Sequence, residues 1–200
     1  MFYRAAQVLH VITGILGFFF SILYVTRYST KHLLPKNTKV FTSITLAAIV
    51  IHSIDLTALH IFHLVQSFQT TALDPCSVQN TVEFCSPFRY TFSFCVFLMV
   101  LNQYFMSIDR LLDTFLVSYR TTQKYVLTFL LVTEVPLAAG LILFTYRHAD
   151  PREKLLSCLN VPQSSMMDVS LTTAAILPIN CLCLLMTILL FQKHQRKIIK

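Results

Sequence analysis

The sequence predicts an all-α membrane protein, a polytopic bundle of five transmembrane helices. Hydrophobic residues make up 55% of the chain, charged residues only 12%, and the mean hydropathy is +0.64, whereas an average soluble domain is about 25% charged. The apolar residues also fall in blocks of roughly 20, the length at which a helix crosses the hydrocarbon of a bilayer. We therefore expect residues 1–200 to form a single transmembrane domain whose main partner is the lipid bilayer.

Five apolar runs bounded by polar residues give the expected spans. In chain order they are Ala5–Val25, Val40–Val65, Phe88–Ile108, Tyr125–Tyr146 and Val169–Phe191. The first follows Arg4 like a secretory signal, but its apolar core is long and no small-residue cleavage site follows, so a retained helix is expected. Ionisable groups within the second and fourth runs lower their hydropathy.

Basic residues set the expected orientation of these spans. The segment between the first two spans and the segment after the fifth each carry Lys and Arg without any acid. The residues are Arg27, Lys31, Lys36 and Lys39, then Lys193, Arg196, Lys197 and Lys200. Because such segments stay in the cytosol, the N-terminus should lie outside and the C-terminus inside. The basic residues behind the net charge of +7 lie in the short segments between apolar runs and form no single basic stripe. Nucleic acid is therefore not an expected partner.

The third span ends on an acid–arginine pair, Asp109 and Arg110. An arginine in this position can pair with its neighbouring acid in one state and with a partner protein in another, which makes the pair a candidate switch. The alternative is a positive-inside arginine whose side chain snorkels to the interface. Cys85 lies 25 residues before Arg110, or about 37 Å of helix. One helix would thus carry a cysteine outside and an arginine inside.

Three cysteines, Cys76, Cys85 and Cys158, lie in or beside loops expected outside the cytosol, where disulfides form. The six cysteines show no CxxC pair and no zinc-type spacing, so a disulfide is favoured over a metal, and no cofactor is expected. Loop length alone leaves Cys76 and Cys158 as rival partners of Cys85. The stabilisation expected from closing the longer loop exceeds that from the shorter loop by only about 1 kcal/mol.

Polar residues also occur inside the expected spans. Four on the second span fall within an arc of about 140° on one side of the helix: His52, Asp55, His60 and His63. They should face protein or water, either as a ligand-facing stripe or as partners in interhelical hydrogen bonds. Glu134 in the fourth span must face inward because an ionised carboxylate in lipid is costly, and Asn102 in the third should bond to a neighbouring helix.

Several short motifs follow one another over residues 33–120. They are Leu34-Pro35-Lys36-Asn37-Thr38-Lys39, His52-Ser53-Ile54-Asp55-Leu56, Asp74-Pro75-Cys76, then Cys85 and Arg89, and finally Ser107-Ile108-Asp109-Arg110-Leu111-Leu112-Asp113-Thr114 with Tyr119. As an ordered set they resemble the nematode serpentine receptors of class alpha and class alpha-beta. Asp109 stands where that family more usually has Glu, a change that keeps the charge.

The resemblance implies a G-protein-coupled chemosensory receptor in the plasma membrane of a sensory neuron. Its partners would be a small-molecule chemical cue outside and a heterotrimeric G protein inside. It also implies that Asp109 and Arg110 form the switch motif, and that Cys85 pairs with Cys158, as the cysteine opening helix three pairs with the loop before helix five in seven-helix receptors. The spans would correspond to helices 1–5 of that fold, so the chain is expected to be truncated before helices six and seven.

A second interpretation is a non-signalling truncated membrane protein that associates with full-length receptors, or a small transporter. A transporter would be expected to show inverted repeats or matching Gly/Pro-broken spans, and this sequence, with three glycines, shows neither. An enzyme is not expected, because the sequence has no nucleophile elbow, H-E-x-x-H motif, P-loop or paired catalytic carboxylates.

Overall fold

The computed structural model describes residues 2–29, 36–69, 79–116 and 119–198. Within these ranges five long helices follow one another: α1 (Phe2–Tyr24), α2 (Lys36–Gln69), α3 (Val82–Phe115), α4 (Tyr119–Thr145) and α5 (Met166–Ile198). Each contains a stretch long and apolar enough to cross a membrane. The predicted all-α membrane bundle is therefore confirmed.

All five helices begin before the predicted apolar runs, and α2, α3 and α5 also end after them. The second run was expected over Val40–Val65, but α2 covers Lys36–Gln69, and α3 begins at Val82 instead of Phe88. Local capping explains the start of α3, because the Thr81 hydroxyl accepts the N–H of Phe84 at 3.3 Å. A π-helical turn, η1 (Val25–Ser29), continues α1. Hydropathy thus locates the membrane-crossing core of each helix, while polar residues determine where the helix ends.

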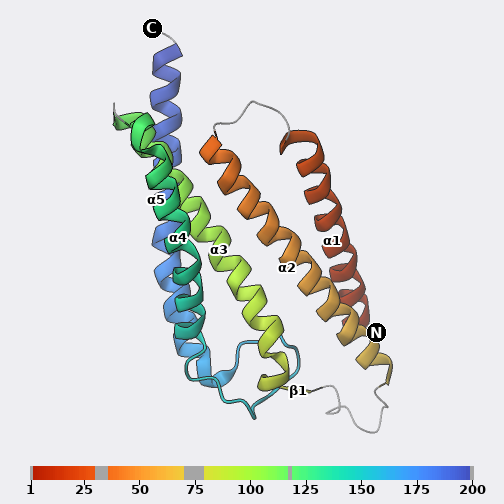
Figure 1. Cartoon of the computed structure of the whole chain (residues 1–200). Helices are drawn as coiled ribbons and strands as arrows, with labels where there is room; N and C mark the ends of the chain where they lie inside the picture. Colours follow the sequence, from red (N-terminus) through yellow and green to blue (C-terminus); the bar gives the residue numbers. More distant parts are fainter. Residues whose placement is uncertain (1, 30–35, 70–78, 117–118, 199–200) are drawn as a thin grey trace.

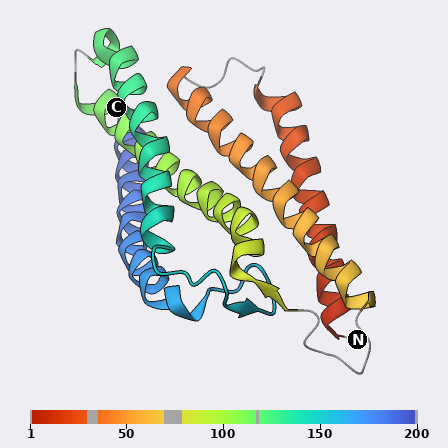
Figure 2. The ribbon, with the colours of Figure 1, turned by 60° about the horizontal axis from the view of Figure 1, so that its bottom comes forward.

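The helices pack in chain order around α3. α1 packs on α2, α2 on α3, and α3 on both α4 and α5. Figures 1 and 2 both show α1 beside α2 and α4 beside α5, with α3 between the two pairs. The two termini lie at opposite ends of the bundle, as an odd number of crossings requires (Figure 1).

Small residues bring α1 close to α2. A Cβ added at Gly14 would collide with the Thr57 hydroxyl, and one added at Gly17 would lie 3.4 Å from the Ser53 hydroxyl. Glycines at such contacts let two helix backbones approach, which is the usual way that membrane helices gain packing contacts. Gly14 therefore positions α1 against α2.

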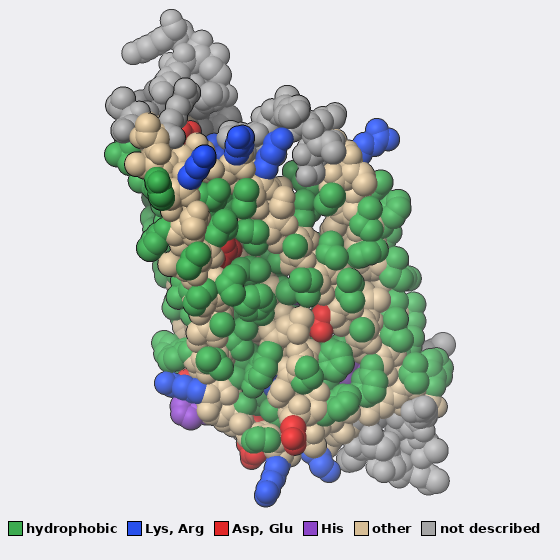
Figure 3. Space-filling view, in the orientation of Figure 1, with side chains coloured by type: hydrophobic (Ala, Val, Ile, Leu, Met, Phe, Trp, Pro, Cys, Tyr) green, Lys and Arg blue, Asp and Glu red, His purple; other side chains and the backbone are tan. Residues whose placement is uncertain are grey.

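On the face that Figure 3 shows, most side chains in the middle are hydrophobic, and Lys and Arg gather at the two ends. Large hydrophobic side chains remain exposed on α1 and α5, as expected where a helix faces lipid. Buried apolar clusters lie between α3 and its neighbours: Phe97, Leu101, Ala138 and Ile142 in one, and Phe41, Phe105 and Leu130 in the other. The core thus follows α3 along its length.

A short two-stranded sheet closes one end of the bundle, which we call the disulfide end; the opposite end is the Asp109 end. Strand β1 (Asn80–Thr81) pairs antiparallel with β2 (Lys154–Leu155). The N–H of Val82 also donates to the Glu153 carbonyl at 2.9 Å. A 3-10 turn, η3 (Gln163–Ser165), then leads into α5. The connection between α4 and α5 is therefore fixed against the first turn of α3.

Candidate functional site

The last turns of α3 place Asp109 and Arg110 at the Asp109 end. Asp109 is only 1% exposed, although it is a charged residue next to the end of a helix. The Arg110 Nη2 atom lies 3.5 Å from Asp109 Oδ2, and the arginine side chain is 27% exposed. The two predicted switch residues thus form an ion pair in which the acid is buried and the base is partly exposed.

Two further helices hold the Asp109 carboxylate. Asn37, at the start of α2, donates through Nδ2 to Asp109 Oδ1 at 2.6 Å, and Tyr119, the first residue of α4, donates its hydroxyl to the same oxygen. Arg110 in turn donates to the Thr38 hydroxyl. None of these three neighbours was predicted as a site residue, although all three belong to the motifs that carry the resemblance. One carboxylate therefore links α2, α3 and α4.

The Tyr119 phenol is a permanent donor in this cluster. Burial, followed by the hydrogen bond to Asp109, raises the pKa of Tyr119 well above its usual range. The hydroxyl therefore stays protonated at physiological pH and keeps donating to the carboxylate. Charge-assisted hydrogen bonds of this kind are about twice as strong as neutral ones, so the cluster can hold α3 in one position relative to α2 and α4.

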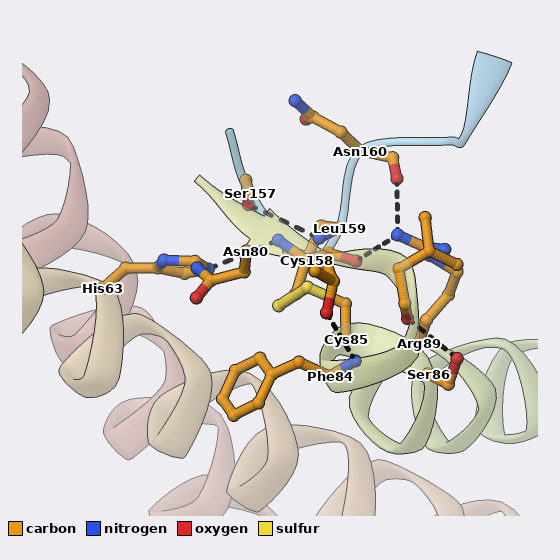
Figure 4. The surroundings of a disulfide bond; sticks show 12 residues. His63, Asn80, Phe84, Cys85, Ser86, Arg89, Ser157, Cys158, Leu159 and Asn160 are labelled. Carbon is orange, nitrogen blue, oxygen red and sulfur yellow. Dashed lines mark hydrogen bonds between the residues drawn. A yellow bond between two sulfur atoms is a disulfide. The ribbon is translucent and has the colours of Figure 1, made fainter. Parts of the chain in front are cut away.

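At the disulfide end, Cys85 and Cys158 are joined by a disulfide (Figure 4), the pairing that the resemblance implies. Both residues are fully buried and pack on Leu59 of α2. Cys76, the rival partner, lies outside the described residues. The bond ties the first turn of α3 to the connection between α4 and α5, which is the segment that leads into α5.

Arg89 lies one turn after Cys85 on α3 and is 2% exposed. Its Nη2 atom donates to the carbonyl oxygens of Cys158 at 3.1 Å and Asn160 at 2.9 Å, as Figure 4 shows. Its guanidinium carbon also lies 5.7 Å from the centroid of the Tyr146 ring. Arg89 was one of the motif residues, but its role could not be predicted because it depends on the fold of the loop beyond β2.

The polar residues of α2 contact different neighbours. His63 is fully buried beside the disulfide, and its Nε2 atom accepts the N–H of Cys158 at 3.4 Å (Figure 4). His60 instead faces α1, where its ring lies 2.5 Å from the Gln7 amide oxygen and stacks on His10 with centroids 4.5 Å apart. These two histidines therefore bridge helices and loops, in line with the interhelical alternative.

The other two members of the stripe face α3. The His52 ring lies 4.9 Å from the Phe92 ring, and Asp55 is half-buried. Asp55 Oδ2 and His52 Nδ1 are buried without a hydrogen-bond partner among the described residues. Within the described ranges, no group of three His, Cys, Asp or Glu side chains could hold a metal ion. The structure does not gather the four residues of the stripe into one site.

Glu134 lies inside the bundle, with 1% of its surface exposed. It is four residues from both Leu130 and Ala138, which are themselves buried on the same face of α4. Its Oε1 atom has no hydrogen-bond partner in the described part of the chain. The carboxyl group thus sits between residues of the two apolar clusters, Leu130 in one and Ala138 in the other.

Two adjoining cavities lie between α3, α4 and α5. The loop-side cavity, of about 180 Å³, is lined by polar groups of Arg89, Ser93 and Tyr146 together with aliphatic side chains of the loop and α5. The mid-bundle cavity, of about 290 Å³, is lined almost wholly by apolar side chains. Both cavities share Phe97 and Thr172 in their walls, so they are adjacent, the loop-side cavity nearer the disulfide end and the mid-bundle cavity further along α5.

Known proteins resemble this chain over nearly its whole length. The family model described as "Serpentine type 7TM GPCR receptor class ab chemoreceptor" matches residues 1–198. The serpentine receptor class beta-18 of Caenorhabditis elegans is 40% identical over 196 residues, which are 98% of this chain and 54% of that receptor. The chain spans about half the length of this curated relative. These matches confirm the predicted resemblance, and they concern receptors rather than a class of enzymes. The chain belongs to the serpentine class ab chemoreceptor family of seven-helix receptors.

Proposed function

We propose that this chain is part of a chemosensory receptor that detects a small-molecule cue outside a sensory neuron and activates a heterotrimeric G protein inside it. The N-terminus and the disulfide end would face outside, and the Asp109 end would face the cytosol. Membership of a chemoreceptor family supports the class of function, and the basic segments around Lys36 and after the fifth predicted apolar run support the orientation. The observation that carries the proposal is the buried Asp109 cluster at the end of α3.

We call the Asp109 cluster a lock, meaning a set of contacts that must break before this end of α3 can move. Asp109 accepts hydrogen bonds from Asn37 and Tyr119 and pairs with Arg110, so any shift of α3 at this end must break contacts to two helices. Hydrogen bonds to charged groups contribute about 1.5–3 kcal/mol each. Effectors typically shift a conformational equilibrium by about 1–3 kcal/mol, which is comparable to one of these hydrogen bonds, so a bound cue could favour a state in which one of them is broken. Arg110 would then be free to donate to an acceptor on the G protein.

Helix α3 could also transmit a movement from the disulfide end of the bundle to the Asp109 end. It is a single helix of 34 residues, about 50 Å long, with Cys85 and Arg89 in its first two turns and the Asp109 pair near its last. A cue that contacts α3, α4 and α5 at the disulfide end could therefore move the far end of α3 as a rigid element.

The test uses a fusion in which residues 1–198 replace the matching part of the class beta-18 relative. Basal nucleotide exchange on a co-expressed G protein and the amount of receptor at the cell surface are measured on the same cells. Arg110→Gln should lower exchange at least about tenfold at unchanged surface amount, since it removes the guanidinium proposed to engage the partner. Asp109→Asn should raise basal exchange by weakening the lock.

Lys124→Gln is the matched control, because Lys124 is an exposed basic residue near the same end of α4. It should leave both exchange and surface amount unchanged. If the Arg110 and Asp109 variants lose surface amount and exchange in equal proportion, the pair has a folding role and the proposed switch is wrong.

A further inference from the structure

Arg89 is a buried cation without a described counter-ion. Its side chain is 2% exposed, and none of the ion pairs among the described residues includes it. Glu153 is near enough to interact electrostatically with Arg89 but forms no ion pair with it; its carboxylate accepts the N–H of Gln163 at 2.6 Å and the Ser164 hydroxyl at 2.8 Å. The Arg89 Nε atom is buried with no hydrogen-bond partner in the described structure.

Such a charge is costly to bury unless it is paired. The carbonyl oxygens of Cys158 and Asn160 offset part of this cost, but both are reached through Nη2 alone. A guanidinium presents five donors in a planar fork that matches the two oxygens of a carboxylate. The local chemistry therefore favours an anionic ligand group beside Arg89.

The loop-side cavity gives that group a place to bind. Arg89 forms part of its wall together with the hydroxyls of Ser93 and Tyr146, which lie 2.9 Å apart. One of the two hydroxyl protons is used in the bond between them, and the other can donate to a second oxygen of the same ligand. In this position the ligand would contact α3, the end of α4 and the loop that the disulfide holds.

The mid-bundle cavity adjoins the loop-side cavity and has a different chemistry. Its wall along α5, from Leu171 to Ile179, is apolar except for Thr172 and covers about 12 Å of helix. With the loop-side cavity it falls within the range of about 300–1,000 Å³ that is usual for small-molecule sites. A ligand that fills both cavities must have one anionic end and one flexible or narrow apolar end.

We propose that the cue is a small amphipathic carboxylate, whose acid group binds Arg89 and whose aliphatic tail enters the mid-bundle cavity between α3, α4 and α5. This inference rests on the proposed chemosensory function and names the chemical class of its ligand. A carboxylate would neutralise Arg89 and add a tie between α3 and the loop before α5, at the end of α3 opposite the Asp109 lock.

The test measures saturable binding of tritiated octanoate to the 200-residue chain in phosphatidylcholine nanodiscs at neutral pH. Octanol and methyl octanoate are the matched neutral competitors. We expect octanoate to bind at least about tenfold more tightly than either, because only the carboxylate pairs with Arg89. Arg89→Gln should abolish this preference while still binding octanol, and Arg89→Lys should keep part of it.

Two control variants separate the site from general effects. Arg147→Gln removes a cation at the same end of the bundle, but Arg147 is already paired with Asp168 at 2.9 Å, so the preference for octanoate should persist. Ala175→Phe should fill the mid-bundle cavity and weaken decanoate about tenfold more than butanoate, whereas Ala174→Phe, on a residue outside both cavity walls, should not.

Three results would overturn the inference. They are the absence of saturable octanoate binding, equal competition by octanol in the parent protein, and an undiminished preference in a folded Arg89→Gln variant. Loss of octanoate binding in nanodiscs that contain phosphatidylserine would instead assign the site to a membrane lipid and contradict a water-borne cue. Each measurement is of binding alone, so G-protein activation by the fusion stays an independent test of the proposed function.

Discussion

Replacing Tyr119 with Phe removes one hydroxyl from the Asp109 cluster and leaves the ring in place. Tyr119 is 1% exposed, and its hydroxyl donates to Asp109 Oδ1. After the change, Asn37 still donates to that oxygen at 2.6 Å and Arg110 remains 3.5 Å from the other. The carboxylate stays buried with one donor fewer. The change also removes the longer contact, 3.5 Å, in which Asn37 Nδ2 donates to the Tyr119 hydroxyl, so the bond to the charged carboxylate dominates the effect.

The magnitude follows from the type of bond. A hydrogen bond to a charged group contributes about 1.5–3 kcal/mol, against about 0.5–1.5 kcal/mol for a neutral pair. Tyr119→Phe should therefore lower the free energy of unfolding by about 1.5–3 kcal/mol. In an Asp109→Asn background the acceptor is neutral, and the same change should cost about 1 kcal/mol less.

The assay is equilibrium unfolding of the 200-residue chain in mixed micelles, arranged as a double-mutant cycle over Tyr119 and Asp109. Tyr125→Phe is the matched control on the same helix, because Tyr125 is 79% exposed, and it should change stability by less than about 0.5 kcal/mol. Strictly additive effects of Tyr119→Phe and Asp109→Asn, or an equal loss in Tyr125→Phe, would refute the cluster as described.

Three further substitutions test other contacts in the same unfolding assay. Gly14→Ala should cost about 1–3 kcal/mol, since its Cβ meets Thr57, whereas Gly140→Ala, with open space around it, should be neutral or slightly stabilising; equal losses would contradict this. Cys158→Ser should lower the free energy of unfolding by about 4 kcal/mol for a separation of 73 residues. A reductant should destabilise the parent protein and leave the variant unchanged; a parent protein that the reductant does not destabilise would contradict the bond. Glu134→Leu should stabilise by about 1–3 kcal/mol because it removes an unpartnered buried carboxyl; a loss would show that Glu134 has a partner.

The number and order of the helices could be predicted because lipid imposes a simple rule. Each crossing needs about 20 apolar residues with all backbone groups bonded within the segment, and five such runs stand out in the sequence. The helix ends could not be predicted in this way. The start of α3 at Val82 depends on the Thr81 cap and on pairing between β1 and β2, which involves a segment more than 70 residues away.

The site could be predicted only where its residues are neighbours in sequence. Asp109 and Arg110 are adjacent, so a pair at the end of the third span could be proposed from the sequence alone. The contact between Asn37 and Asp109 joins residues 72 positions apart, and it depends on how α2 crosses α3. The same holds for the polar residues of α2, where an inward-facing arc could be predicted but the separate partners of His60 and His63 could not.

The orientation of the bundle underlies both proposals, because the Asp109 end must meet the G protein and the loop-side cavity beside Arg89 must meet the cue. It can be measured with single reporter cysteines in a chain whose Cys76, Cys95, Cys181 and Cys183 are replaced by serine, so that the Cys85–Cys158 disulfide stays. Arg152→Cys reports on the disulfide end and Lys124→Cys on the Asp109 end, and both positions are exposed. An impermeant maleimide should label the Arg152 reporter in intact cells and the Lys124 reporter only after permeabilisation. Labelling of the Lys124 reporter in intact cells, with the Arg152 reporter protected, would contradict the account.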